Sequence, residues 1–387
     1  MTKFVSILGS TGSVGLAVLK ILDKDRLIKI NLLCANKSYS LICSQIKKYK
    51  PKIFIINNHL IFKKVKKKFK KKNTIILNTF NSLKIKKKSD ITVSAIPGIA
   101  GLQPTLKMIE GSKKILIANK ESIICGWDLL SKKAKKNKAK IIPIDSEHFS
   151  IMKLLETNKL EDINKIYITA SGGPFLNYSI NQLKKIRPSD ALKHPKWKMG
   201  KKVTIDSATL MNKILELIEA QLLFNLDLKK LDILIHPESL VHAVVELNNG
   251  LCKFIYHDTS MIIPIANAIY EDKLNINHFY IKKNNVIKNL TFKKVNPKIF
   301  PVIKLKKRVT EYPSTPIIIN SANEILVDQF LKKKIPFLSI IKIILSILSN
   351  RNYIKNAIIK PSTINQINLI DSWARRKTLE LLKQHYE

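Results

Sequence analysis

The first 145 residues alternate short apolar runs with helix-like segments, and this alternation constrains the fold more than any other feature of the sequence. The apolar runs expected to form strands are 4–8, 28–34, 52–56, 74–77, 91–94, 114–117 and 139–142, and the first expected helix is 12–22. Strands that alternate with helices along a chain pair in parallel, with helices on both faces of the sheet. The sequence therefore predicts an α/β fold that begins with a doubly wound parallel sheet.

A glycine-rich segment, Gly9–Gly15, lies between the first expected strand and the first expected helix. It has the spacing G-x-x-G-x-x-G, which departs from the common dinucleotide pattern G-x-G-x-x-G. Glycines at such a turn allow a pyrophosphate to approach the backbone, and the helix start offers N–H donors. We expect a Rossmann-type cofactor site, against the alternative of a glycine turn without a ligand.

The second expected strand ends in Ala35–Ser38, where an enzyme that uses NAD usually has an acidic residue for the ribose 2′-hydroxyl. No acidic residue is present. Lys37, between the small polar residues Asn36 and Ser38, suits a 2′-phosphate, so the sequence favours NADP over NAD. The alternative is that Lys37 is an ordinary surface lysine.

Two further expected strands end in polar side chains. Asn119 and Lys120 follow one strand, and Asp145 and Glu147 follow the next, just before His148. In open α/β sheets, ligands bind beyond the carboxyl ends of the strands, and carboxylate pairs suit hard divalent cations. We expect a metal site at Asp145 and Glu147. The alternatives are that Asp145 or Ser146 is the N-cap of the next helix, and that Lys120 is a solvated lysine at a helix start.

The middle of the chain has a different character. A strand expected at 165–169 runs into the polar glycine turn 170–175, and a long irregular stretch ends at 194–200. Such a turn can present several N–H groups to an anion, and long loops in compact domains are often lids. We expect a lid at about 172–201 that carries Trp197 and Met199. The alternative is that Trp197 only anchors the loop to the core.

A long helix is expected from Val203 through Glu216, with Ser207 at its start, where backbone N–H groups are free. Asn212 and Lys213 share one side of this helix with Glu216. We expect Ser207, Asn212 and Lys213 to suit a phosphate, and Glu216 to be partly buried and to need a partner such as a metal. The alternative is a simple Lys213–Glu216 ion pair.

The remaining segments complete the expected organisation. Asn248–Gly250 separates two strand-like runs and predicts an antiparallel hairpin. His236 and His242 lie on or beside strands, where either could be a packing residue. Helical periods dominate from the opening segment Asn320–Glu324 onward, with breaks at Pro336 and Pro361, which predicts a small helical bundle. We expect a cofactor domain at 1–147, an α+β catalytic domain at 148–270, a linker at 271–312 and a helical domain at 313–387.

The formal net charge of +41 at first favours a nucleic-acid partner. However, only six of the 69 basic residues are arginines, and arginine is the residue that base and phosphate readers prefer. Most of the lysine runs also lack interleaved aromatic residues. Lysine, isoleucine and asparagine have A/T-rich codons, so we attribute the excess to a reduced, A/T-rich bacterial genome and expect no nucleic-acid partner. We expect the positive field to attract small phosphorylated molecules.

The sequence has no signal-peptide pattern at its start and no apolar run long enough to span a membrane. The four cysteines lie far apart, without the spacing of a metal site. We therefore expect reduced, structural cysteines in a cytoplasmic protein without a membrane partner.

Taken together, these motifs resemble the 1-deoxy-D-xylulose 5-phosphate reductoisomerase family, and they occur in the family's order. The matching segments are 9–15, 118–122, 145–148, 171–175, 194–200, 206–216, 235–239 and 320–324. The departures are Ile214 and Asn36, at positions where the family commonly has glycine. Ile214 could crowd the turn between Lys213 and Glu216.

The resemblance implies roles for individual residues. It implies that a divalent metal, Mg²⁺ or Mn²⁺ with Co²⁺ as a further candidate, is held by Asp145, Glu147 and Glu216. It implies that the substrate phosphate contacts Ser171, Ser207, Asn212 and Lys213, and that the rest of the substrate contacts Ser146, Lys120, His194, Trp197 and Met199. It implies that NADPH contacts Gly9, Ser10, Thr11, Gly12, Ser13, Val14, Asn36, Lys37, Ser38, Asn119, Lys120, Glu121 and Gly200. The catalytic residues would be Lys120, Asp145, Glu147, His194 and Glu216, in a homodimer.

The implied reaction fits these residues. The metal would polarise the ketone of 1-deoxy-D-xylulose 5-phosphate while the carbon skeleton rearranges to a branched aldehyde. NADPH would then reduce the aldehyde to 2-C-methyl-D-erythritol 4-phosphate, in the non-mevalonate route to isoprenoids. Two other functions compete with this one. The first is an NADP-dependent, metal-assisted dehydrogenase of a phosphorylated hydroxy acid, and the second is a basic nucleic-acid-binding protein with an inactive Rossmann domain.

Overall fold

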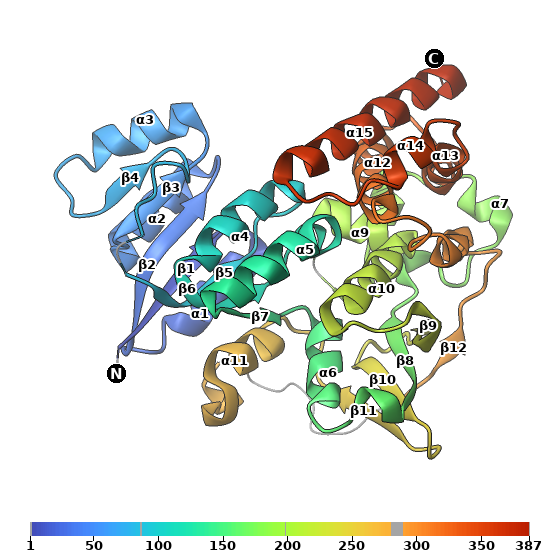
Figure 1. Ribbon diagram of the computed structural model, residues 1–387, viewed down its shortest axis with the longest axis horizontal. Coiled ribbons are helices and arrows are strands. Elements are labelled where there is room, and N and C mark those ends of the chain that lie inside the picture. Colours follow the sequence, from blue (N-terminus) through green and yellow to red (C-terminus); the bar gives the residue numbers. More distant parts are fainter. Residues whose placement is uncertain (1, 86, 198, 280–288, 387) are drawn as a thin grey trace. The chain divides into compact units, whose positions relative to one another are not determined.

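A computed structural model describes residues 2–85, 87–197, 199–279 and 289–386 (Figure 1). The chain divides into two compact units, and its path passes between them several times. The first unit contains residues 1–123, 127–149 and 260–285, and the second contains 124–126, 150–259 and 286–387. Each unit is described separately below.

The first unit is built on a seven-stranded parallel sheet, so the predicted parallel sheet is confirmed. Its strands are β1 (Lys3–Leu8), β2 (Ile28–Ala35), β3 (Ile53–Ile56), β4 (Ile75–Leu77), β5 (Ser89–Ser94), β6 (Ser112–Ile117) and β7 (Lys140–Pro143). They lie in the order β4-β3-β2-β1-β5-β6-β7. Each strand lies within about two residues of the predicted run, because β-branched apolar residues form strands when both faces are covered.

The order of the strands makes the sheet doubly wound. The chain moves outward from the central strand β1 to β4, returns to β5 beside β1, and then moves outward in the other direction. The crossover helices are α1 (Ser13–Leu22), α2 (Tyr39–Tyr49), α3 (His59–Lys68), α4 (Leu102–Ile109) and α5 (Lys120–Asn137). Because such crossovers are right-handed, the reversal at β1 places helices on both faces of the sheet. All carboxyl ends of the strands therefore meet at one edge.

The second unit contains a mixed five-stranded sheet. Its strands are β8 (Ile163–Ala170), β9 (Leu231–Ile235), β10 (Val241–Leu247), β11 (Cys252–Tyr256) and β12 (Lys293–Lys294), in the order β11-β10-β8-β9-β12. β8 pairs in parallel with β9, and the other pairs are antiparallel. The hairpin predicted at Asn248–Gly250 is confirmed, because Gly250 takes a left-handed conformation (φ 85°) between β10 and β11.

The prediction of one long helix from Val203 onward was wrong. Two helices occupy this segment, α9 (Lys201–Ala208) and α10 (Met211–Phe224). They are separated at Leu210, which takes a left-handed backbone conformation (φ 65°) that ends helical hydrogen bonding. Ser207 consequently lies near the end of α9, where backbone N–H groups are already engaged, and not at a helix start.

The C-terminal part of the second unit is helical, as predicted. Its helices are α12 (Thr315–Leu331), α13 (Ser339–Leu348), α14 (Tyr353–Ala357) and α15 (Ile364–Tyr386), and α12 packs along α15. Pro336 precedes α13 and Pro361 precedes α15, as expected for helix breaks. The prediction that Asn320–Glu324 opens this region was wrong, because this segment lies in the middle of α12.

Shorter elements connect these parts. The remaining α-helices are α6 (Ser146–Leu155), α7 (Ile180–Leu183), α8 (Pro188–Ala191) and α11 (Ile262–Tyr270). The 3₁₀ turns are η1 (Ile99–Gly101), η2 (Leu160–Asp162), η3 (Gly173–Phe175), η4 (Leu228–Lys230), η5 (Glu271–Lys273), η6 (Ile276–His278) and η7 (Pro301–Lys307). Among the described residues, no helix has the length and apolar character needed to cross a membrane.

The segment expected to be a linker, 271–312, contributes to both units. Its first part, up to residue 285, belongs to the first unit, and the part from 286 belongs to the second. The side chains of Phe300, Val302 and Leu305 are buried in the second unit. These residues therefore contribute to a core, whereas the division into three domains remains a prediction.

Candidate functional site

The glycine loop lies at the carboxyl end of β1, where the order of the strands reverses. Gly9 has a φ of 85°, and a Cβ atom there would lie only 2.6 Å from the carbonyl oxygen of Ala95. A Cβ at Gly15 would lie 2.3 Å from the carbonyl oxygen of Gly9. Both positions therefore exclude any larger residue, since the loop and the start of α1 pack backbone against backbone. Gly12 caps α1 without a side-chain hydrogen bond, so the first N–H groups of the helix are available to an anion.

The other residues assigned to the cofactor differ in exposure. Ser10 is fully buried, and its hydroxyl donates to Gln45 Oε1 at 2.7 Å, while Gln45 Nε2 donates to the Ser10 carbonyl at 2.8 Å. The side chain of Ser10 thus fastens the loop to α2. Gly12 and Ser13 are exposed, Thr11 and Val14 are half-buried, and Asn36, Lys37 and Ser38 are exposed at the end of β2.

Asn119 joins the carboxyl ends of two neighbouring strands. It is the N-cap of α5, where its Oδ1 accepts from the Ser122 N–H at 2.6 Å. Its Nδ2 donates to the carbonyls of Ile96 and Gly98, which follow β5. Lys120 is half-buried and Glu121 is buried at the start of the same helix. Asn119 therefore orients the start of α5 at the sheet edge that carries the glycine loop.

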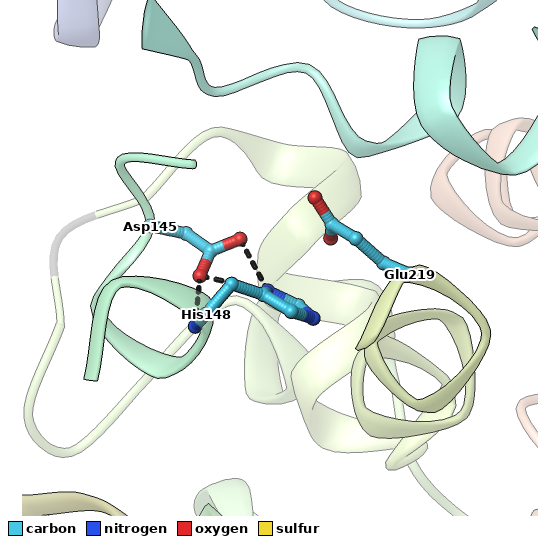
Figure 2. Close-up of side chains that lie close together, drawn as sticks. All are labelled: Asp145, His148 and Glu219. Atoms are coloured by element: carbon cyan, nitrogen blue, oxygen red, sulfur yellow. Dashed lines mark hydrogen bonds and ion pairs between the residues drawn. The ribbon is translucent and has the colours of Figure 1, made fainter. Parts of the chain in front are cut away.

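Asp145 is the N-cap of α6, so the cap expected as an alternative is present (Figure 2). Its Oδ1 accepts from the His148 N–H at 2.7 Å, and the His148 ring Nδ1 lies 2.7 Å from Oδ2. Ser146 Oγ donates to Glu147 Oε2 at 2.7 Å. No role was predicted for His148, although its spacing of three residues from Asp145 is the spacing of a helix cap.

In the second unit, His194 brings together two serines that are far apart in sequence. Its Nε2 lies 3.1 Å from both Ser171 Oγ, after β8, and Ser207 Oγ, on α9. Its Nδ1 accepts from the backbone N–H groups of Lys196 (3.1 Å) and Trp197 (2.8 Å). Because Nδ1 is an acceptor, the hydrogen of the neutral ring is on Nε2, which leaves both serine hydroxyls able to donate to an anion.

The ionisation of His194 agrees with this tautomer. Burial and, to a smaller extent, the positive charge of Lys213 together lower the pKa of His194 from 6.5 to about 4. The ring is therefore neutral at physiological pH. A neutral hydrogen-bond donor beside a lysine favours the binding of a phosphate, because the negative charge of the phosphate offsets the positive charge of the lysine.

Helix α10 presents the other residues assigned to the phosphate and the metal. Lys213 Nζ lies 2.7 Å from Glu216 Oε2, and Asn212 Nδ2 donates to Glu216 Oε1. The ion pair considered as an alternative is therefore present, and the burial predicted for Glu216 is confirmed at 2 % exposure. Glu219, for which no role was predicted, lies on α10 one turn after Glu216 (Figure 2). Its side chain is 1 % exposed. Ile214 is fully buried among core residues, so the departure from glycine is accommodated in the core.

Gly173 determines how closely η3 can approach α9. It has a φ of 61°, and a Cβ there would lie 3.1 Å from both the Ser207 carbonyl oxygen and Ala208 Cα. A cavity of about 380 Å³ borders this contact, and Ser171, Pro195, Lys196 and Glu238 are among the residues that line it. The cluster therefore borders a cavity large enough for a small molecule on the side of Ser171.

The loop expected to be a lid is partly packed. Trp197 is half-buried and lies edge-on to the ring of His242, with ring centroids 6.1 Å apart. His242 is buried and stacks on His257 at 4.0 Å. Met199 is half-buried, and Gly200 is exposed at the N-cap of α9. The anchoring contact considered as an alternative for Trp197 is therefore present, and the movement of the loop remains a prediction.

Three family models match the chain. Their descriptions are 1-deoxy-D-xylulose 5-phosphate reductoisomerase, over residues 5–126; 1-deoxy-D-xylulose 5-phosphate reductoisomerase C-terminal domain, over 141–224; and DXP reductoisomerase C-terminal domain, over 258–377. Together they match most of the chain.

Whole-chain relatives agree with these models. The 1-deoxy-D-xylulose 5-phosphate reductoisomerase of Pelagibacter ubique is 45 % identical, covering 97 % of this chain and 98 % of its own. That of Clostridium acetobutylicum is 37 % identical, covering 97 % and 99 %.

Solved structures agree as well. A DOX-P reductoisomerase crystallised with NADPH, fosmidomycin and magnesium has a TM-score of 0.90 and 31 % identity, covering 98 % of both chains. The Zymomonas mobilis enzyme in complex with NADPH has a TM-score of 0.88 and 29 % identity, covering 99 % of this chain and all of its own. The chain therefore belongs to the 1-deoxy-D-xylulose 5-phosphate reductoisomerase family.

Proposed function

We propose that this protein converts 1-deoxy-D-xylulose 5-phosphate to 2-C-methyl-D-erythritol 4-phosphate with NADPH and a divalent metal. The observation that carries the proposal is the Ser171–His194–Ser207 cluster. Its two hydroxyls and neutral imidazole make it suitable for binding a phosphate. Lys213 lies close enough to lower the pKa of His194, so it adds positive charge to the same site. A dehydrogenase of a phosphorylated hydroxy acid could also use this cluster, and the membership of the chain in the reductoisomerase family favours the rearrangement over simple dehydrogenation.

The metal is assigned to Asp145, Glu147 and Glu216. Carboxylate oxygens are the ligands that Mg²⁺ and Mn²⁺ prefer, and Asp145 and Glu147 follow a strand at the ligand-binding edge of the parallel sheet. The metal would supply Lewis-acid chemistry at the substrate's carbonyl and hydroxyl oxygens. Glu216 is buried against Lys213 and Asn212, so a cation would replace part of an existing charge pairing.

The cofactor is assigned to the loop Gly9–Val14, the exposed segment Asn36–Ser38, the start of α5 (Asn119–Glu121) and Gly200. The loop fits a pyrophosphate, since Gly9 and Gly15 leave no room for side chains and α1 has unsatisfied N–H groups. NADPH would supply the hydride. Lys37 would pair with the 2′-phosphate, and Ser10 would support the loop from beneath through Gln45.

The substrate-contacting residues would act by positioning. Ser171, Ser207, Asn212 and Lys213 would hold the phosphate, while Ser146, Lys120 and His194 would orient the rest of the substrate. Trp197 and Met199 would exclude water by closing over it, which requires Trp197 to leave His242.

The assembly and location are also proposed. The resemblance to the family supports a homodimer with a cofactor domain at 1–147, a catalytic domain at 148–270 and a helical domain at 313–387. The excess of lysine over arginine supports a bacterial, A/T-rich origin and no nucleic-acid partner. The widely spaced, free cysteines support a cytoplasmic location. Analytical ultracentrifugation tests the dimer, and a filter-binding assay with duplex DNA at physiological salt tests the absence of a nucleic-acid partner.

The decisive experiment follows absorbance of the reduced cofactor with purified protein, NADPH, Mg²⁺ and 1-deoxy-D-xylulose 5-phosphate. We expect oxidation of NADPH that requires both the metal and the phosphorylated substrate. Absence of oxidation by the wild-type protein contradicts the proposal. In the same assay, Glu216→Gln should abolish metal-dependent turnover but still bind NADPH, and full activity in that variant would restrict Glu216 to an ion-pair role.

A further inference from the structure

The segment Asn320–Glu324 matches the family but has no role in the site assigned above. It lies in the middle of α12, where Asn320, Ser321 and Asn323 are fully buried. A buried polar side chain lowers stability unless it is hydrogen-bonded, so each of these residues should have a partner that explains its presence. The partner of Ser321 lies on α15 and that of Asn323 lies on α9, whereas Asn320 donates to Glu324 within α12 itself.

Asn323 is the residue that reaches α9. Its Nδ2 donates to Asp206 Oδ1 at 2.8 Å, and Lys202 Nζ lies 2.7 Å from Asp206 Oδ2. Asp206 is 1 % exposed. A carboxylate this deeply buried depends on its donors, because removing one of them leaves a charge uncompensated. Asn323 therefore fixes where the carboxylate of Asp206 can lie.

Asp206 is directly followed by Ser207, whose hydroxyl lies 3.1 Å from His194 Nε2. Consecutive residues of an α-helix point about 100° apart, so holding Asp206 toward α12 also fixes the direction of Ser207 on the adjacent face of α9. The helix ends at Ala208 and the chain turns at Leu210, so α9 is short. A short helix of two turns needs a tertiary anchor to keep its rotation about its own axis.

Helix α12 is itself held in place. Ser321 Oγ donates to Asp371 Oδ1 at 2.6 Å, and Arg375 pairs with both Asp371 and Glu324. These contacts join α12 to α15 on the side away from Asp206. Asn323 thus connects α9 to the packed pair of helices α12 and α15, and so fixes the position of α9 relative to them.

The chemistry of Asn323 favours a role beyond packing. Among the described residues, no hydrogen-bond partner is found for its Oδ1, which is buried. An apolar residue of similar size would avoid that cost, so core packing alone does not account for an amide. The amide's one strong contact is with Asp206.

We infer that Asn323 and Asp206 are positioning residues for the reaction: they hold α9 so that the Ser207 hydroxyl faces the phosphate of the substrate. The inference rests on the proposed function, in which Ser207 contacts that phosphate. Neither residue touches the substrate. They act through the orientation of one helix.

The test is a charge swap in the full-length protein. Asn323→Asp places two carboxylates together, and Asp206→Asn removes the charge that faces Lys202. We expect each single change to raise KM for the phosphorylated substrate by about tenfold or more, with a smaller change in kcat and no change in NADPH affinity. The double variant Asp206→Asn/Asn323→Asp restores an amide–carboxylate pair and should recover most of that loss.

Two further variants make the result specific. Ser321→Ala removes one buried contact between α12 and α15, while the Arg375–Glu324 pair between the same helices remains. It should therefore lower the free energy of unfolding but leave KM unchanged. Asn323→Ser is a milder change that keeps a polar residue, and it covers the case in which Asn323→Asp fails to fold. We expect Asn323→Ser to raise KM as well.

The outcomes separate the inference from the proposed function. If wild-type protein does not oxidise NADPH with the substrate, the proposed function fails. If wild type is active but the Asn323 variants keep a normal KM, the inference is overturned. A KM rise in Ser321→Ala equal to that in Asn323→Ser, or no recovery in the charge swap, also overturns it, because either result would mean that loss of general stability is the cause.

Discussion

His194 is the residue whose ionisation has the clearest consequence. Its pKa falls from 6.5 to about 4 because of burial and Lys213, so the folded protein disfavours the charged ring. Between these two pH values the unfolded chain binds more protons than the folded protein. The free energy of unfolding therefore decreases as pH falls from about 6.5 toward 4.

We predict that NMR titration of the His194 ring in the ligand-free protein gives a pKa near 4. In the variant His194→Gln, the free energy of unfolding should decrease less between pH 6.5 and 4 than in the wild type. Urea unfolding at several pH values measures this difference. A His194 resonance that titrates near 6.5 would contradict the buried, lysine-facing position of the ring.

Gly9 provides a second prediction at this scale, with Gly250 as its matched control. Both have a φ of 85°, but a Cβ at Gly9 would lie 2.6 Å from a carbonyl oxygen, whereas nothing lies within 4 Å of a Cβ at Gly250. Gly250→Ala should cost about 1 kcal/mol of stability from backbone strain alone. Gly9→Ala should cost about 3 kcal/mol and weaken NADPH binding, measured by unfolding and by cofactor fluorescence. Equal costs would show that crowding by Ala95 is absent.

At the level of elements, helix caps separate stability from function. Asn119 caps α5 and also holds the carbonyls of Ile96 and Gly98, whereas Asn58 caps α3 through a single 3.0 Å hydrogen bond. Asn58→Ala should cost about 1 kcal/mol and leave KM for NADPH unchanged. Asn119→Ala should cost at least as much and raise that KM, because the start of α5 loses its orientation. An unchanged KM in Asn119→Ala would restrict Asn119 to capping.

The same elements show what the sequence could and could not predict. Parallel strands such as β1, β2 and β5 were located from short, mostly apolar runs rich in β-branched residues, because both faces of the sheet are covered. The break at Leu210 was missed because its left-handed conformation arises from tertiary packing at a buried leucine, and the segment contains no glycine or proline to mark it.

The site was predicted to a different extent in its two halves. The loop Gly9–Gly15 and the residues after β6 and β7 follow from topology, because carboxyl ends of parallel strands share one edge. The contacts of His194 with Ser171 and Ser207 could not follow from topology, since the three residues lie on a strand end, a loop and a helix. The sequence pattern pointed to Ser207 and to the turn that contains Ser171, and the resemblance to the family added His194, but neither gave the geometry.

At the level of the whole molecule, the net charge of +41 produces a long-range attraction for anions. We predict that kcat/KM for the phosphorylated substrate falls as ionic strength rises from about 10 mM to about 500 mM, because salt screens this field. The control is a shortened substrate analogue without the phosphate, whose low kcat/KM should vary much less. A flat profile for the phosphorylated substrate would mean that the excess lysines have no effect on capture.

The contact between Gly173 and α9 has a consequence for how this sequence can vary. Any side chain at position 173 must both adopt a left-handed backbone and displace Ser207 or Ala208. In a saturation library selected for function, we therefore expect glycine alone at position 173, while exposed Asn177 and Tyr178 nearby accept many residues. The exposed residues around this site can therefore change during evolution, whereas the close approach of η3 to α9 at Gly173 cannot.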